Sequence, residues 1–183
     1  TGRTTTNPTY ENYVSGGHIE VVEITYDPDV VGYGELLKVY WKQVDPTDPG
    51  GQFSDRGHGY TTAIFYFNDS QRKEAELSKK NLEKRMVYKN KIVTPILPAP
   101  AFYKAEEYHQ DYYKKNPIRY KFYRHHSGRD RFLDKAWEGE AKPPDADTGL
   151  GGSRLTRSPS APGMTTCIPA TSTVSGVDPN RSL

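Results

Sequence analysis

The sequence has a single cysteine, Cys167, among its 183 residues. An internal disulfide framework is therefore excluded, because a disulfide needs two thiols. Cys167 stands between Thr166 and Ile168, in a stretch without a cationic neighbour. A reactive thiolate needs an electropositive environment. We therefore assign this cysteine no catalytic role.

Long apolar runs and a large net charge are also lacking. The mean hydropathy is −0.85, and no stretch approaches the roughly 20 apolar residues that a membrane-spanning helix needs. The formal net charge of +2 argues against a nucleic-acid binder held by phosphate contacts. The first ten residues, TGRTTTNPTY, lack the apolar stretch of a signal peptide. We expect a cytoplasmic protein that binds neither nucleic acid nor membrane.

Aromatic residues are missing from the last part of the chain. Residues 140–183 contain no Phe, Trp or Tyr and are rich in Pro, Ser, Thr and Gly. A segment of this composition cannot bury enough apolar area to become ordered. The sequence therefore predicts a folded domain over residues 1–139 and a disordered, low-complexity tail over 140–183.

Strand and helix patterns alternate along the predicted domain. Apolar alternation and β-branched residues indicate strands, and apolar residues at helical spacing indicate helices. The strands are expected at Ile19–Tyr26, Tyr60–Phe67 and Ile92–Ile96, and the helices at Gly34–Val44, Ser70–Met86 and 104–115. Asp69 or Ser70 is the expected cap of the second helix. This order predicts an α/β sandwich with a sheet of few strands.

A carboxylate begins the first predicted strand, in the stretch GHIEVVEITYDP. Residues two apart in a strand share a face, so Glu20 points the same way as Ile24 and Tyr26, on the more apolar face. An ionised carboxylate there is costly unless a cation or hydrogen bonds hold it, and a protonated one is a proton donor. Glu20 is thus a candidate general acid; the alternative is a strand-edge glutamate or the partner of a nearby lysine.

The loop DRGHGY is a second candidate. It delivers Asp55 and Tyr60 to the start of a buried strand, and loops on a rigid scaffold often carry functional groups. The alternative is a simple turn, because Asp and Gly are good turn residues. Spacing alone favours the turn.

A third candidate lies in EEYHQDYY, where His109 stands among tyrosines that include Tyr112. The alternative is a hydrogen-bonded core histidine. Glu106 and His109 form a Glu-x-x-His pair that occurs once in the sequence. Di-metal helical bundles use that pair twice, so we expect no metal site.

Taken in order, several motifs resemble one known family, the class A methionine sulfoxide reductases, which reduce the S epimer of methionine sulfoxide. The resemblance covers most of residues 1–139 and leaves the tail without a counterpart. It implies an α/β (α+β) fold, a ferredoxin-like two-layer sandwich with a small mixed sheet and long coil segments. The motifs are NPTYE (Asn7–Glu11), SGGHIEVVEITYDP (Ser15–Pro28), Asp45-Pro46, DRGHGY (Asp55–Tyr60) with TTAIFY, and FYKAEEYHQDYYKKNP (Phe102–Pro117).

The resemblance also implies roles for individual residues. Glu20 matches the acid that protonates the sulfoxide oxygen, while Tyr10 and Tyr60 match the tyrosines that hydrogen-bond this oxygen. A sulfoxide sulfur becomes electrophilic only when its oxygen is protonated or strongly hydrogen-bonded. Asp55 matches the family's loop aspartate. The residues matching a His and a Tyr beside the pocket are His109 and Tyr112.

The family's nucleophile is a cysteine in a Gly-Cys-Phe-Trp-Gly motif ahead of NPTY, and this sequence has no such motif. We therefore expect no turnover from residues 1–183. Lys121 stands where many members carry a resolving cysteine. Recycling would then depend on direct attack by an external thiol, from thioredoxin or a similar reductant, on the sulfenic acid. The resemblance implies a monomer without a cofactor, acting on oxidised proteins or free methionine sulfoxide.

Two other hypotheses remain open at this point: a non-catalytic relative that binds sulfoxides or methionine-rich surfaces, and an inactive fragment. Gly59 stands where the family usually has a glutamine, which is expected to loosen the pocket. The segment YKFYRHHSGRDRFLDKAWEG, from residue 120 to 139, is expected to pack on the domain.

Overall fold

A computed structural model describes residues 6–9, 12–140 and 164–169. The described residues form a mixed α/β fold with a four-stranded sheet of order β1-β6-β4-β5 and a two-stranded sheet of β2 and β3. The strands are β1 (Val21–Tyr26), β2 (Gly51–Gln52), β3 (Asp55–Arg56), β4 (Ile64–Tyr66), β5 (Ile96–Pro98) and β6 (Met164–Pro169). The helices are α1 (Tyr33–Trp41), the 3-10 turn η1 (His58–Tyr60), α2 (Asp69–Lys84), α3 (Tyr112–Lys115), α4 (Pro117–His126) and α5 (Arg129–Ala136).

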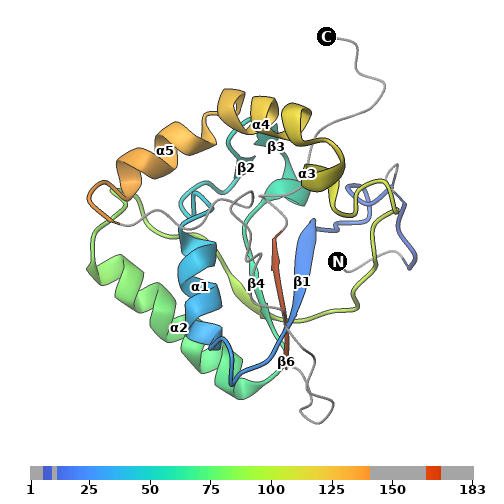
Figure 1. Cartoon of the computed structure of the whole chain (residues 1–183). Helices are drawn as coiled ribbons and strands as arrows, with labels where there is room; N and C mark the ends of the chain where they lie inside the picture. Colours follow the sequence, from blue (N-terminus) through green and yellow to red (C-terminus); the bar gives the residue numbers. More distant parts are fainter. Residues whose placement is uncertain (1–5, 10–11, 141–163, 170–183) are drawn as a thin grey trace.

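The larger sheet is mixed. β4 and β5 pair in parallel, while β6 is antiparallel to both β1 and β4. Helices α1 and α2 lie side by side along one face of this sheet, and α4 crosses the end at which β1 begins (Figure 1). The α/β class with a small mixed sheet, expected from the sequence, is confirmed.

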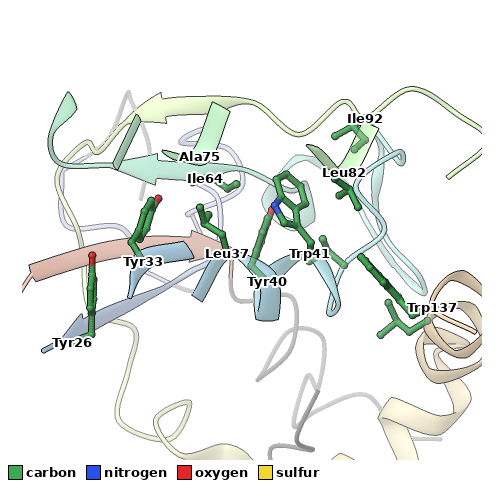
Figure 2. Close-up of a cluster of buried hydrophobic side chains, with 12 residues drawn as sticks. Tyr26, Tyr33, Leu37, Tyr40, Trp41, Ile64, Ala75, Leu82, Ile92 and Trp137 are labelled. Carbon is green, nitrogen blue, oxygen red and sulfur yellow. The ribbon is translucent and has the colours of Figure 1, made fainter. Parts of the chain in front are cut away.

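The main core lies between the sheet and helices α1 and α2 (Figure 2). Leu37 and Trp41 lie one turn apart on the apolar stripe of α1, and both are buried. Trp41 Nε1 donates a hydrogen bond of 2.9 Å to Ser78 Oγ, which joins α1 to α2. The sheet contributes Tyr26 from β1 and Ile64 from β4. This packing fixes the sheet against the helices.

The opposite face of the sheet carries a smaller cluster. Phe65, next to Ile64 in β4, packs there against Ile19 and Val21, because successive side chains of a strand point to opposite faces. Ile24 and Tyr26 pack toward the helices instead. The sequence placed Glu20 on the same face as Ile24 and Tyr26. In β1, that face is the one that packs against the helices.

Several element ends differ from the expected ones. β1 begins at Val21, which leaves Glu20 just ahead of the strand. The cap of α2 is Asn68, whose side chain accepts a 2.9 Å hydrogen bond from the Gln71 amide, so Asp69 and Ser70 are wrong as the cap. One asparagine oxygen positioned before the helix satisfies an amide that the helix itself leaves unpaired.

Two expected elements are shorter or shifted. The helix expected over 104–115 is limited to α3, because Asp111 adopts a left-handed backbone (φ 54°) that interrupts a right-handed helix. The third strand lies at Ile96–Pro98 rather than Ile92–Ile96. Pro95 has no N–H to donate, but its carbonyl accepts a 2.9 Å hydrogen bond from the Ile64 amide and aligns β5 beside β4.

The segment after α3 packs on the domain, as the sequence predicted. Leu133 of α5 and Trp137 just beyond it are buried in the main core. Lys42 and Arg85 both approach the Trp137 ring, each at 5.3 Å from its centroid. Among the described residues, no helix is long and apolar enough to cross a bilayer.

Part of the predicted tail forms a strand. Residues 164–169 form β6, which lies between β1 and β4. The backbone of Cys167 is in register with Glu23 and Phe65. The segment is a strand because its backbone pairs with a neighbouring strand on each side. Its amino-acid composition does not predict this pairing. The remainder of the tail lies outside the described residues, and a domain boundary at residue 139 stays a prediction.

Two aliphatic residues of α1 give a matched test of this core. Leu37 is 1% exposed, whereas Val39 is 44% exposed. Leu37→Ala should lower the free energy of unfolding by about 2–5 kcal/mol, because it leaves a cavity in a packed core. Val39→Ala should change it by less than about 0.5 kcal/mol. Urea unfolding followed by circular dichroism measures both, and equal effects would contradict this core.

Candidate functional site

Three polar side chains meet at the start of β1. The Tyr13 hydroxyl donates a hydrogen bond of 2.8 Å to Glu20 Oε1 and lies 3.1 Å from the Tyr60 hydroxyl. All three side chains are partly buried. One carboxyl and two phenols therefore form a continuous hydrogen-bonded group, here called the Tyr13–Glu20–Tyr60 group.

The backbone brings these residues together from segments far apart in the sequence. The Glu20 amide donates a 3.0 Å hydrogen bond to the Gly59 carbonyl, which ties the start of β1 to the η1 turn. Tyr13 is held by a series of turns: its amide bonds to Thr9, and its carbonyl accepts from His18 at 2.9 Å. These bonds bring the Tyr13 hydroxyl between the Glu20 carboxyl and the Tyr60 hydroxyl.

Both phenols of the group stay protonated at neutral pH. Burial raises the pKa of Tyr13 far above its ordinary value, and the nearby Glu20 charge and its hydrogen bonds add to the shift. Burial also raises the pKa of Tyr60, with the charges of Glu20 and Asp55 adding to it and the hydrogen bond with Tyr13 opposing it. Protonated phenols at this position can donate hydrogen bonds to a ligand oxygen.

Asp55 lies next to this group, at the start of β3. Burial raises the pKa of Asp55, and the Glu20 charge adds to the shift. The Tyr123 hydroxyl donates a short hydrogen bond to Asp55 Oδ1, and Arg129 supplies a positive charge; both oppose the shift. The Tyr123 hydroxyl also lies 3.1 Å from Ser54 Oγ. Helices α4 and α5 thus hold the Asp55 carboxyl.

Arg129 is the buried cation of the site. Its guanidinium lies 4.8 Å from the centroid of the Phe53 ring, and Nη1 donates a 3.2 Å hydrogen bond to the Gln43 carbonyl. Burial lowers the pKa of Arg129 to about 10. That value is well above neutrality, so Arg129 remains charged and offsets part of the negative charge of Asp55.

The small β2–β3 hairpin fixes where Asp55 lies. Gly51 has φ 146°, and a Cβ there would come within 2.2 Å of the Asp55 carbonyl oxygen, so only glycine fits. The Gln52 side chain is fully buried and bonds to both the amide and the carbonyl of Asp45, at 2.9 and 2.8 Å. This loop is therefore rigidly connected to the residues after α1.

The structure brings together only some of the residues that the sequence proposed. Glu20, Tyr60 and Asp55 lie close together. Tyr10 lies outside the described residues. His109 lies 3.9 Å from the Glu106 carboxylate, and Tyr112 begins α3. That His109 and Tyr112 lie beside the site stays a prediction.

Sequence reasoning missed two tyrosines of the site. Tyr13 is seven residues before Glu20, in the same segment as the proposed Tyr10, and its spacing alone gave no reason to prefer it. Tyr123 is 68 residues from Asp55, so only the docking of α4 reveals their contact. The expected loosening of the pocket at Gly59 stays a prediction; the Tyr13 ring lies beside this glycine.

The charged residues of this region do not suggest a metal site. Within the described ranges there is no group of three or more His, Cys, Asp or Glu residues arranged to hold a metal ion. The site therefore consists of hydrogen-bond donors and acceptors around Glu20, with Asp55 and its buried arginine beside them.

Comparison with known proteins places the chain in a family. The family model described as peptide methionine sulfoxide reductase matches residues 1–141. The chain is 59% identical over 139 residues to the peptide methionine sulfoxide reductase MsrA of Bacillus licheniformis, covering 75% of this chain and 77% of that protein. It is 53% identical over 139 residues to the MsrA of Bacillus subtilis, covering 75% and 78% of the two chains. The chain belongs to the peptide methionine sulfoxide reductase family.

A solved structure agrees with this assignment. The methionine sulfoxide reductase A of Corynebacterium diphtheriae superimposes with a TM-score of 0.54 at 32% identity. The match covers 64% of this chain and 61% of that chain, so this chain spans less than two thirds of that structure. The resemblance stated from the sequence motifs is therefore confirmed at the level of the family.

Removing the Tyr123 hydroxyl should move the titration of Asp55. In Tyr123→Phe the hydrogen bond that favours the charged carboxylate is lost, so the pKa of Asp55 should rise further. A raised folded pKa means that stability falls as pH increases from the ordinary value of 3.8 through the folded value. In Tyr123→Phe, the loss of stability with increasing pH should continue to a higher pH than in the unsubstituted chain.

Carbon-detected NMR of the Asp55 carboxyl measures the shift, and urea unfolding at several pH values measures the loss of stability. Tyr66→Phe, in β4, is the matched control and should leave the titration of Asp55 unchanged. An Asp55 midpoint that is the same in Tyr123→Phe and in the natural chain would contradict the assigned hydrogen bond.

Proposed function

We propose that this chain takes part in the reduction of methionine sulfoxide in oxidised proteins and in free methionine, with the Tyr13–Glu20–Tyr60 group activating the sulfoxide oxygen. The hydrogen bond from Tyr13 to Glu20, continued by the contact between the Tyr13 and Tyr60 hydroxyls, carries the proposal. Glu20 donates the proton and Tyr60 donates a hydrogen bond to the same oxygen. Tyr10 belongs to the same proposal through the family resemblance.

The activation follows from the electronic demand of the reaction. A thiolate attacks the sulfoxide sulfur only if the oxygen can leave with its negative charge neutralised, and a positioned acid supplies that neutralisation. The S–O bond breaks, methionine is released, and the attacking cysteine becomes a sulfenic acid. A second thiol then attacks the sulfenic sulfur, which releases water and forms a disulfide. A dithiol such as thioredoxin restores the cysteine with two electrons.

The 183 residues lack a cysteine at the position where the family has its attacking thiol. The sequence has no Cys-Phe-Trp motif, and its single cysteine is Cys167 of β6. Residues 1–183 are therefore proposed to bind and polarise a sulfoxide without turning it over. His109 and Tyr112 are proposed to contact the rest of the substrate, and Asp55 to support the Glu20 side of the site.

Binding of small probes tests the activation of the oxygen. The 183-residue chain should bind N-acetylmethionine (S)-sulfoxide about 5- to 10-fold more tightly than N-acetylmethionine, because each added hydrogen bond contributes about 0.5–1.5 kcal/mol. Tyr60→Phe removes one donor and should lower this ratio about threefold. Amide NMR titration measures both affinities.

Tyr66→Phe is the control for that experiment, since Tyr66 is a partly buried tyrosine at the end of β4 and is not a member of the Tyr13–Glu20–Tyr60 group. It should retain the ratio of the natural chain. Equal affinity of the natural chain for the sulfoxide and the thioether would reject the proposed function.

Turnover tests the missing thiol. With dithiothreitol and methyl p-tolyl sulfoxide, residues 1–183 should form no sulfide above the level of the Cys167→Ser variant. When the family's Gly-Cys-Phe-Trp-Gly segment is joined ahead of Thr1, reduction should appear. In that fusion, Glu20→Gln should lower kcat about 10²- to 10⁴-fold, the range for loss of a general acid. An unchanged rate in Glu20→Gln would remove Glu20 as the acid.

A further inference from the structure

A glycine next to the site has an unusual neighbour. Gly59 is buried, and a Cβ added to it would come within 3.0 Å of Tyr13 Cε2 and 3.6 Å of the His18 carbonyl oxygen. A contact of 3.0 Å is tighter than ordinary van der Waals packing, so a side chain at this position would require the Tyr13 ring to shift by a few tenths of an ångström. The absence of a side chain at Gly59 leaves room for the Tyr13 ring in its observed position.

The backbone carbonyl of Gly59 also contributes to the Tyr13–Glu20–Tyr60 group. It accepts the hydrogen bond from the Glu20 amide, and the next residue is Tyr60. The distance from the Gly59 backbone to Glu20 and Tyr60 is therefore fixed. With its ring beside this glycine, Tyr13 has its hydroxyl 2.8 Å from Glu20 Oε1 and 3.1 Å from the Tyr60 hydroxyl.

The Tyr13 hydroxyl carries one proton, which it can donate to one neighbour at a time. Donation to Tyr60 leaves Glu20 able to give its own proton to a ligand oxygen. Once Glu20 has become a carboxylate, donation from Tyr13 to Glu20 is the stronger, charge-assisted bond. The bridging phenol thus fits both protonation states of the carboxyl without movement of the backbone.

We propose that Tyr13 is a positioning residue of the sulfoxide site, which holds Glu20 and Tyr60 on either side of one hydroxyl, and that Gly59 makes room for it. This inference rests on the proposed function and adds two residues to it. Tyr13 and Gly59 act as a pair: the glycine leaves space, and the tyrosine ring occupies it. Substitution of either member should therefore disturb the same property.

The property to measure is selectivity rather than affinity. Loss of positioning should weaken binding of N-acetylmethionine (S)-sulfoxide and leave binding of N-acetylmethionine unchanged, because only the sulfoxide oxygen uses the group. A general loss of structure would weaken both probes alike. Tyr13→Phe keeps the ring and removes the hydroxyl, and it should lower the sulfoxide-to-thioether ratio about threefold.

Gly59→Ala should lower the ratio by a similar factor, through displacement of the ring. Gly34→Ala, in α1, is the matched control, because a Cβ there meets no atom within 4 Å, and it should have no effect. In a Tyr13→Ala background the added methyl group at Gly59 has no ring to displace, so Gly59→Ala should then change the ratio no further. This double-mutant cycle isolates the interaction between the two residues.

The outcomes separate the two proposals. If the natural chain does not prefer the sulfoxide, the proposed function fails, and the role of Tyr13 fails with it. If the natural chain prefers the sulfoxide and Tyr13→Phe retains the full preference, the role of Tyr13 fails alone. A Gly59→Ala effect that persists unchanged in the Tyr13→Ala background, or a fall in the affinities for both probes together, also overturns it.

Discussion

One backbone hydrogen bond determines much of the site. The Glu20 amide donates to the Gly59 carbonyl at 3.0 Å, at the point where β1 begins and η1 ends. This bond fixes the carboxyl of Glu20 relative to Tyr60, which follows Gly59 directly in the chain. The Tyr13 hydroxyl approaches both residues in this arrangement. The proposed site needs an acid and a phenol within reach of one oxygen. Their relative position depends on a hydrogen bond between backbone groups, which substitution of a side chain leaves intact.

Two carboxyls lie close together in this site, and their surroundings differ. Glu20 has phenols as neighbours, whereas Asp55 receives a hydrogen bond from Tyr123 and faces the buried charge of Arg129. Carboxyls whose environments differ in this way are suited to different roles. We propose Glu20 as the proton donor because it is the carboxyl hydrogen-bonded within the Tyr13–Glu20–Tyr60 group.

The sequence predicted the fold class, the family and the location of Glu20, because these depend on local alternation and on motifs of contiguous residues. It could not predict contacts that depend on packing. The Tyr123–Asp55 bond joins residues 68 apart and requires α4 to be docked. Asn68 was missed as a cap because Asp69 and Ser70 are equally good cap residues by composition. The strand β6 pairs with β1 on one side and β4 on the other, and the composition of the segment does not predict this pairing.

The helices after α3 connect the site to the core. Tyr123 of α4 and Arg129 at the start of α5 reach Asp55 and Phe53, while Leu133, one turn further along α5, is buried in the main cluster. The burial of Leu133 against the core therefore fixes the register with which Arg129 enters the site. A buried guanidinium is costly unless its charge and its hydrogen bonds are satisfied. Asp55 supplies an opposite charge, and the Gln43 carbonyl accepts a hydrogen bond from Arg129 Nη1. The packing that stabilises the fold and the electrostatics that prepare the site are thus carried by the same short helix.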